Sequence, residues 1–300
     1  MDLVATFDGS GQIGPQPLFK THGHSLSDRW HDSRMYQLRK VQIPVLPDGT
    51  GEIRILHISD LHLTPSKRRE IAWLKSLASE KPDFVISTGD HLAHPEAVAI
   101  ALDALAPLLE IPGAFVFGSN DYFGPRLKSP LRYLFGHEDT RIHGAELPSH
   151  ELALALISRG WFDLNDAAKT IKHGDIEIEF RGTDDAHLNR DHYSLVAGAK
   201  RTDLLIGVTH APYARILTAM ANDDADLILA GHTHGGQVRL PWPGGSKALV
   251  TNCDLPPWRA RGLTRVDGQP WLHVSAGLGT NPFTPFRVAC PPEVSLLTLV

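Results

Sequence analysis

Short apolar runs alternate with amphipathic segments through the first half of the chain. Residues 53–58, 84–87 and 113–117 are apolar runs of strand length, and each ends in a polar loop. Between them, residues 67–80 and 95–109 carry apolar side chains at helical spacing, with charge on the opposite side. This order of strand, loop and helix predicts a right-handed βαβ core with a largely parallel sheet.

The second half is richer in hairpin signals, and two sheets packed face to face with helices outside would accommodate both halves. Trp242 to Gly245 predicts a loop near a pocket. The other predicted elements are an edge strand at 36–46, helices at 147–159 and 212–220, and strands at 161–164, 169–172, 175–181, 202–209, 226–230, 271–275 and 294–300.

Domain organisation follows from where these patterns begin and are interrupted. Residues 1–35 are rich in Gly, Pro, Ser and His without periodicity, which predicts a loose N-terminal arm. Residues 36–300 show neither an internal repeat nor a linker, so we expect one domain. Residues 123–150 form an insertion with four basic side chains, either a cap over an anionic substrate or a solvated loop.

Composition narrows the function classes. The net charge of -5 and the absence of basic stripes with interleaved aromatic residues argue against a nucleic-acid partner. Cys253 and Cys290 form no metal-binding or disulfide spacing. No apolar run approaches the ~18 residues of a transmembrane helix, and the first residues lack the features of a signal peptide. We expect a cytoplasmic protein, with peripheral membrane contact left open.

Polar side chains follow each of the first three predicted strands. Asp60 and His62 follow the first strand, Asp90 the second, and Asn120 and Asp121 the third. A single Asp or Asn at such a place is more often a helix N-cap than a ligand. Because the carboxyl ends of parallel strands meet at one edge of a sheet, three such sites in a row favour a ligand cluster there.

Three histidines follow two strands of the second half. His210 ends the strand at 202–209, and residues 231–236 read Gly-His-Thr-His-Gly-Gly after the strand at 226–230. Glycine lets the backbone adopt positive φ and approach whatever the imidazoles hold. Histidine is the commonest transition-metal ligand, so His232 and His234 favour a metal site over a plain polar loop.

In chain order, the motifs resemble those of one family. They are Asp-x-His at 60–62, Gly-Asp at 89–90, Gly-Ser-Asn-Asp at 118–121, His210, and Gly-His-x-His at 231–234. The calcineurin-like metallophosphoesterase family has the similar pattern DxH, GD, GNH(D/E), H, GHxH. The resemblance spans about residues 53–280 and is strongest to the bacterial branch related to YkuE and YaeI. It implies an α/β fold, a four-layer α/β/β/α sandwich.

The resemblance also implies two metal ions bridged by Asp90. Asp60, His62 and His234 would hold the first ion, and Asn120, His210 and His232 the second. Carboxylate, imidazole and carboxamide ligands together suit Mn, Fe or Zn. Two such ions lower the pKa of a shared water and clamp phosphate oxygens during in-line attack.

One motif departs from the family pattern, because Ser119-Asn120-Asp121 lacks the histidine that precedes the acidic residue. Aligned on Asp121, Ser119 takes the ligand position and Asn120 the histidine position. Shifted by one, Asn120 is the ligand and Asp121 replaces the histidine. We favour the second alignment, because a carboxamide oxygen is the better neutral ligand. Asp121, or His91 beside Asp90, is then the catalytic candidate.

The expected activity is hydrolysis of a phosphodiester or a phosphoanhydride by water that two metal ions activate. One alternative is a phosphomonoesterase of the same fold. Another is a metal- or ligand-binding protein weakened in catalysis by the altered loop at 118–121. The expected partner is a small phosphorylated substrate, with a lipid-linked one included, and the sequence does not indicate an oligomeric state.

Overall fold

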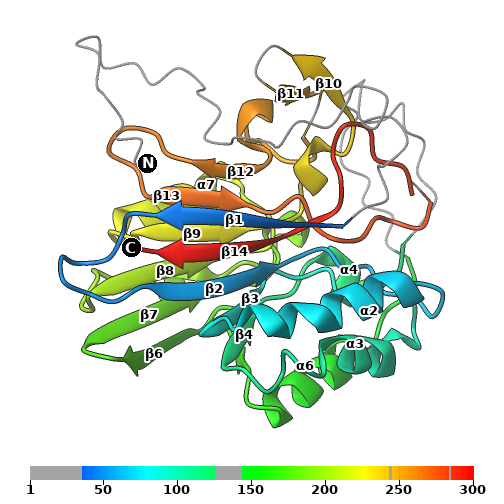
Figure 1. Cartoon of the computed structure of the whole chain (residues 1–300), viewed down its shortest axis with the longest axis horizontal. Helices are drawn as coiled ribbons and strands as arrows, with labels where there is room; N and C mark the ends of the chain where they lie inside the picture. Colours follow the sequence, from blue (N-terminus) through cyan, green and yellow to red (C-terminus); the bar gives the residue numbers. More distant parts are fainter. Residues whose placement is uncertain (1–35, 126–143, 243–244, 250, 284) are drawn as a thin grey trace.

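Two six-stranded sheets lie against each other in the computed structural model, with helices on their outer faces (Figure 1). The structure describes residues 36–125, 144–242, 245–249, 251–283 and 285–300. The predicted arm at 1–35 and most of the predicted insertion therefore lie outside the described residues. Among the described residues, no helix is long and apolar enough to cross a bilayer.

The first sheet is mixed. Its order is β1 (Gln37–Ile43), β14 (Glu293–Leu299), β2 (Ile53–Ile58), β3 (Phe84–Ser87), β4 (Gly113–Phe115) and β5 (Phe162–Asp163). Strands β2 to β5 are parallel to one another, as the βαβ pattern predicts. β14 runs antiparallel to β2 and parallel to β1, which is the edge strand that the alternating pattern indicated.

The second sheet has a parallel centre and antiparallel edges. Its order is β12 (Gly262–Thr264), β13 (Trp271–Val274), β9 (Leu227–Ala230), β8 (Leu204–Val208), β7 (Ile176–Gly182) and β6 (Ala168–His173). β13, β9, β8 and β7 run parallel, so their carboxyl ends share one edge. β12 and β6 pair antiparallel at the two sides.

Helices complete four layers, which confirms the predicted sandwich. α2 (Arg68–Ser76), α3 (Ala97–Leu105) and α6 (Ser149–Ser158) contribute to the apolar cluster on the outer face of the first sheet. α7 (Ala214–Asn222) covers the second sheet. The short helical turns are η1 (Leu77–Glu80), α4 (Ser119–Tyr122), η2 (Ala186–Leu188), η3 (Tyr193–Leu195), η4 (His234–Gly236) and η5 (Pro257–Arg259).

Alternation along the buried strands produces these layers. Successive side chains of a strand point to opposite faces of the sheet. In β2, Ile55 therefore packs between the two sheets, whereas Leu56 packs under the helices. The same division holds in β14, where Leu297 faces the second sheet and Leu296 the helices. Both faces of the first sheet are buried, as continuous apolar runs predict.

One hairpin was not predicted. Trp242 ends β10 (Arg239–Trp242) and Gly245 begins β11 (Gly245–Ala248), and the two strands form a separate sheet on either side of the predicted loop. Residues 243–244 of that loop lie outside the described residues. The pattern concealed this hairpin, because Pro241 and Pro243 interrupt it and proline is a poor strand residue. The short strand β12 was likewise not predicted.

Candidate metal centre

The loops that follow four strands meet at one edge of the sandwich. The first sheet supplies Asp60 and His62 after β2 and Asp90 after β3, and the second supplies His210 after β8 and the 232–234 loop after β9. The two sheets are joined directly here, because the backbone N–H of His232 donates to Asp60 Oδ2 at 3.1 Å. The centre therefore forms only when both sheets are in place.

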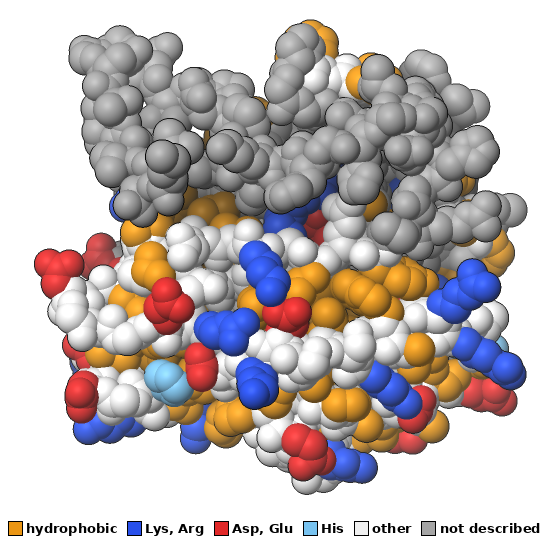
Figure 2. Space-filling model, in the orientation of Figure 1, with side chains coloured by type: hydrophobic (Ala, Val, Ile, Leu, Met, Phe, Trp, Pro, Cys, Tyr) orange, Lys and Arg blue, Asp and Glu red, His pale blue; other side chains and the backbone are white. Residues whose placement is uncertain are grey.

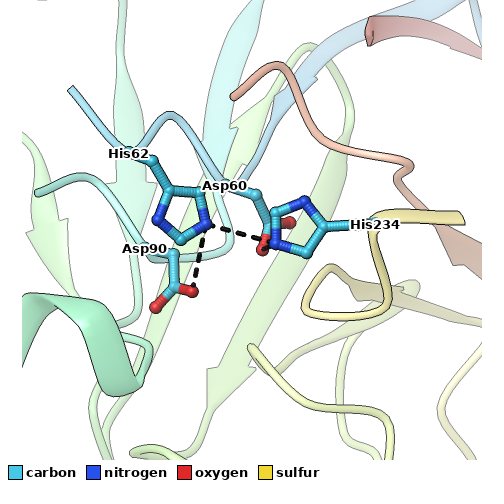
Figure 3. Close-up of side chains that lie close together, drawn as sticks. All are labelled: Asp60, His62, Asp90 and His234. Atoms are coloured by element: carbon cyan, nitrogen blue, oxygen red, sulfur yellow. Dashed lines mark hydrogen bonds and ion pairs between the residues drawn. The ribbon is translucent and has the colours of Figure 1, made fainter. Parts of the chain in front are cut away.

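Four of the predicted ligands converge on one point. The ligand atoms of Asp60, His62, Asp90 and His234 all lie within 4.8 Å of one another (Figure 3). His62 Nε2 lies 3.2 Å from His234 Nε2 and 3.5 Å from Asp90 Oδ2. His234 Nε2 lies 3.6 Å from Asp60 Oδ1. Two carboxylates and two imidazoles at this spacing form a group that can hold a transition-metal ion.

A second group adjoins the first through Asp90. His210 Nε2 lies 3.6 Å from Asp90 Oδ2, the oxygen that also faces His62. His232 Nδ1 lies 3.2 Å from His210 Nε2. Asp90 therefore stands between two sets of imidazole nitrogens, which is the position that a bridging carboxylate needs.

The backbone at these ligands is unusual. Asp60, His62, Asp90, His232 and His234 all have φ between 43° and 68°. This left-handed region costs energy for residues other than glycine, and such residues cluster at functional sites. Gly231 is needed for close approach, because a Cβ there would overlap Ser59 Oγ. Gly235 and Gly236, which follow His234, have φ of 63° and 80°.

Backbone carbonyls orient two of the rings. His210 Nδ1 lies 2.6 Å from Thr88 O, and His232 Nε2 lies 3.4 Å from Asn252 O. A carbonyl can only accept, so the proton of each neutral ring sits on that nitrogen. The lone pairs of His210 Nε2 and His232 Nδ1 then face the centre, as they do in histidines that ligate metals.

Two buried atoms of the first group lack a hydrogen-bond partner. Asp60 Oδ1, which faces His234, and His62 Nδ1, on the side of the ring away from His234 and Asp90, are both buried and unpaired among the described residues. Only Asp60 Oδ1 points to the centre. Asp60 Oδ2, in contrast, accepts from Ser59 Oγ at 2.6 Å. Buried polar atoms are rarely left unpaired unless an ion or a water completes them. The side chains present thus fit a metal ion on this side of Asp90.

Burial and neighbouring charges shift the pKa values of the side chains at the centre. It lowers the pKa of His62 and His232 well below the usual range and that of His234 to about 4, so all three rings are neutral at pH 7. Burial raises the pKa of Asp90 to about 7. Although burial opposes it, the carboxylates around His210 raise its pKa to about 9. Metal ions bind neutral imidazoles, so the three neutral rings are ready to ligate, whereas His210 would release its proton when an ion binds.

The altered motif lies beside the bridging position. Asn120 donates to Asp90 twice, from its backbone N–H to Oδ1 and from Nδ2 to Oδ2, both at 2.7 Å. Its carboxamide thus presents a donor, rather than its oxygen, to Asp90. Asn120 is brought to the centre, and its role as a metal ligand stays a prediction.

Asp121 has another environment. Its buried carboxylate accepts from the backbone N–H groups of Asp90 and His91 at 2.8 Å and of Gly118 at 3.0 Å. His91 is also buried, with Nδ1 3.2 Å from Asp121 and Nε2 2.7 Å from Ser87 Oγ. These contacts join the loop at Asp90 to the loop at Gly118. The catalytic roles of Asp121 and His91 stay predictions.

Several side chains near the centre carry no motif in the sequence. Arg287 is buried, and its Nη2 lies 3.2 Å from His234 Nδ1, while Nη1 donates to Ala276 O at 2.7 Å. The rings of His187 and His232 have centroids 4.7 Å apart, and His187 Nδ1 lies 2.9 Å from Tyr213 OH. In the sequence, only the position of His187 after a strand indicates a role near the centre. That position is equally typical of an ordinary turn.

Comparison with known proteins agrees with this geometry. The family model of calcineurin-like phosphoesterases matches residues 53–236, the segment that contains all five motifs. The chain belongs to that family.

Two bacterial relatives align over most of the chain. The metallophosphoesterase YkuE of Bacillus subtilis is 26% identical over 270 residues, which cover 86% of this chain and 83% of YkuE. The phosphodiesterase YaeI of Escherichia coli is 25% identical over 271 residues, covering 88% of each protein. The predicted resemblance to this bacterial branch is confirmed.

Proposed function

We propose that the protein hydrolyses a phosphodiester or a phosphoanhydride at a centre of two metal ions. The observation that carries this proposal is the convergence of Asp60, His62, Asp90 and His234 within 4.8 Å. Membership of the phosphoesterase family supports ester hydrolysis, and the phosphodiesterase name of the relative YaeI favours a diester.

The ligands divide into two sets that share Asp90. Asp60, His62 and His234 would hold one ion, and His210 and His232 the other, with Ser119 or Asn120 as a further ligand. When bound, Mn, Fe or Zn ions supply Lewis-acid polarisation of a phosphoryl oxygen and lower the pKa of water.

The remaining side chains position these ligands. Asn120 holds both carboxylate oxygens of Asp90, and Thr88 O fixes the ring of His210. If Ser119 is the ligand, Asn120 takes the histidine position as a neutral donor, which can hydrogen-bond a substrate oxygen but has no acidic proton to give to a leaving group. We therefore expect faster hydrolysis of aryl esters, whose leaving groups need no proton, than of alkyl esters.

The test compares metal content and turnover in wild type and Asp90→Ala. We expect about two metal ions per chain and hydrolysis of bis-nitrophenyl phosphate by wild type, exceeding that of nitrophenyl phosphate. Asp90→Ala should lose both ions and reduce turnover by about a hundredfold or more, because each ion supplies several kcal/mol.

Asp103→Ala is the matched control, because it removes an exposed carboxylate on α3 that pairs with Lys75. It should keep wild-type metal content and turnover. Faster turnover of the monoester would favour a phosphomonoesterase. Two bound ions without turnover of either ester would favour the binding protein, and wild type without metal would contradict the proposal.

A further inference from the structure

Exposed apolar side chains gather in one part of the second half of the chain. Trp242 and Trp258 are 63% and 56% exposed. Most other exposed large apolar side chains of the described residues lie in the same stretch: Leu240, Leu249, Val266, Phe283, Phe286 and Val288. Such a concentration usually marks an interaction surface, whereas single exposed apolar residues do not.

Several of these side chains belong to one contiguous feature. β10 pairs with β11, and on its other side the backbone N–H of Arg239 donates to Val288 O at 2.9 Å. η5, which carries Trp258, packs against β11. We name β10, β11, η5 and residues 285–288 the aromatic lobe. Orange side chains reach the upper edge of Figure 2, where Figure 1 draws β10 and β11.

The hairpin of the aromatic lobe is apolar on both faces. Leu240, Pro241 and Trp242 are consecutive in β10, and all three are exposed. Since successive side chains of a strand point to opposite faces, these apolar groups project both ways.

Basic side chains accompany the tryptophans. Lys247 Nζ lies 5.7 Å from the ring centre of Trp242, and Arg259 Cζ lies 5.8 Å from that of Trp258. Lys247 and Arg265 are exposed and Arg259 is half-buried, whereas Arg239 and Arg287 are buried and Arg261 pairs with Glu293. Tryptophan beside Lys or Arg suits the interface of a bilayer with anionic headgroups.

We propose that the aromatic lobe docks on an anionic membrane surface. Trp242 and Trp258 enter the interfacial layer, and Lys247 and Arg259 contact acidic headgroups. The combination of an apolar hairpin with adjacent basic groups is the pattern of peripheral membrane anchors, in which apolar burial and electrostatic attraction act together.

The aromatic lobe is connected directly to the metal centre. The backbone N–H of Gln237 donates to His234 O at 2.9 Å, and Arg239 Nη1 donates to Gly235 O at 2.6 Å. Docking therefore holds the centre close to the membrane. A corollary, which rests on the proposed function, is that the hydrolysed phosphate is carried by a lipid or a lipid-linked molecule.

The test is co-sedimentation of the full chain with vesicles of phosphatidylcholine, with and without an equal part of phosphatidylglycerol. Wild type should bind the anionic vesicles, and more weakly as salt is raised. Trp242→Ala/Trp258→Ala should bind at least about tenfold more weakly. Leu154→Ala/Ile157→Ala is the matched control, because it removes two exposed apolar side chains from α6, outside the aromatic lobe.

Metal content and turnover of bis-nitrophenyl phosphate are measured in every variant. Both double variants should equal wild type, so weaker sedimentation with unchanged turnover reports the docking alone. If no protein, wild type included, hydrolyses the ester, the proposed function is contradicted and the membrane proposal is judged by sedimentation alone. Wild type that ignores anionic vesicles, or that forms a dimer which the tryptophan variant dissociates, would overturn the membrane proposal.

Discussion

The two sets of proposed ligands that share Asp90 differ in how they are held. In the first set, Asp60, His62 and His234 converge with Asp90 within 4.8 Å, and all four have positive φ. In the second set, only His232 has positive φ, and carbonyl oxygens orient both imidazoles. The altered motif at 118–121 adjoins this second set.

This difference shows where substitution can be tolerated. The first set depends on strained backbone that three loops enforce together, so each member fixes the others. The second set relies on hydrogen bonds from its surroundings, and Asp121 keeps the loop at Gly118 in place whichever residue follows. A change from the family pattern is therefore less disruptive at Ser119 and Asn120 than it would be at Asp60.

The largest expected effect comes from removing one imidazole from each set. His62→Ala and His210→Ala should each lower turnover of bis-nitrophenyl phosphate by about a hundredfold or more, because a lost ion removes several kcal/mol of transition-state stabilisation. Elemental analysis should find about one ion per chain in each variant. Two ions in either variant would show that its histidine is no ligand.

The next largest effect concerns Asp121, whose carboxylate joins the loop at Asp90 to the loop at Gly118. Asp121→Asn keeps the size of the side chain but replaces one acceptor oxygen by a donor that faces backbone N–H groups. We expect a loss of about 2–3 kcal/mol in unfolding free energy, the cost of a charged buried hydrogen bond. Metal affinity should fall about 10- to 100-fold. Urea unfolding and calorimetric metal titration would measure both, with Asp103→Asn as the exposed control.

A smaller effect distinguishes the two alignments of the altered motif. With Ser119 as the ligand, Ser119→Ala should weaken metal binding about tenfold. Asn120→Ala should then reduce turnover while two ions stay bound, and Asn120→His should raise turnover of alkyl diesters relative to aryl diesters. Metal loss in Asn120→Ala and not in Ser119→Ala would establish Asn120 as the ligand.

A last effect, on stability and not on activity, is a pH dependence that arises behind the second set. His57 Nδ1 lies 2.9 Å from His273 Nδ1, and His57 Nε2 lies 3.0 Å from Oγ1 of Thr88, whose carbonyl orients His210. Burial lowers the pKa of His273 to about 4 and that of His57 well below its usual range.

Both rings are therefore neutral when folded, and the unfolded chain binds more protons below about pH 6.5. The unfolding free energy of the metal-free protein should fall as pH drops from about 6.5 to 4, by at most about 1.4 kcal/mol per pH unit for each ring. His273→Gln should flatten this slope in urea unfolding curves. A slope equal to that of wild type would exclude His273 as a source.

Sequence patterns predicted the parts of the fold in which local and tertiary requirements agree. β3 lies at Phe84–Ser87 as predicted, because an apolar run between Pro82 and a Gly-Asp loop fits only a buried strand. The place of β14 beside β1 could not be read from the sequence, since pairing between distant strands leaves no local periodicity. The β10–β11 hairpin was missed for a local reason, because proline interrupts the strand pattern of β10.

The candidate site was likewise predictable where local sequence carries the signal, and not where distant contacts decide. Asp60, His62, Asp90, His210, His232 and His234 were predictable, because their residue types follow predicted strands in the order of a known family. The environment of Asp121 was not, since it depends on N–H groups of a loop 30 residues away. Arg287 contacts His234 from 53 residues further along the chain and has no surrounding motif.

The central place of β14 has a consequence for how the protein is made. This strand lies between β1 and β2, and Glu293 at its start accepts from Arg39 and Arg261. Synthesis has to pass residue 299 before β1 gains its neighbour in the described sheet. Nascent chains therefore expose an unpaired strand edge until late, which is a known aggregation hazard, and expression at lower temperature or with chaperones should improve the yield.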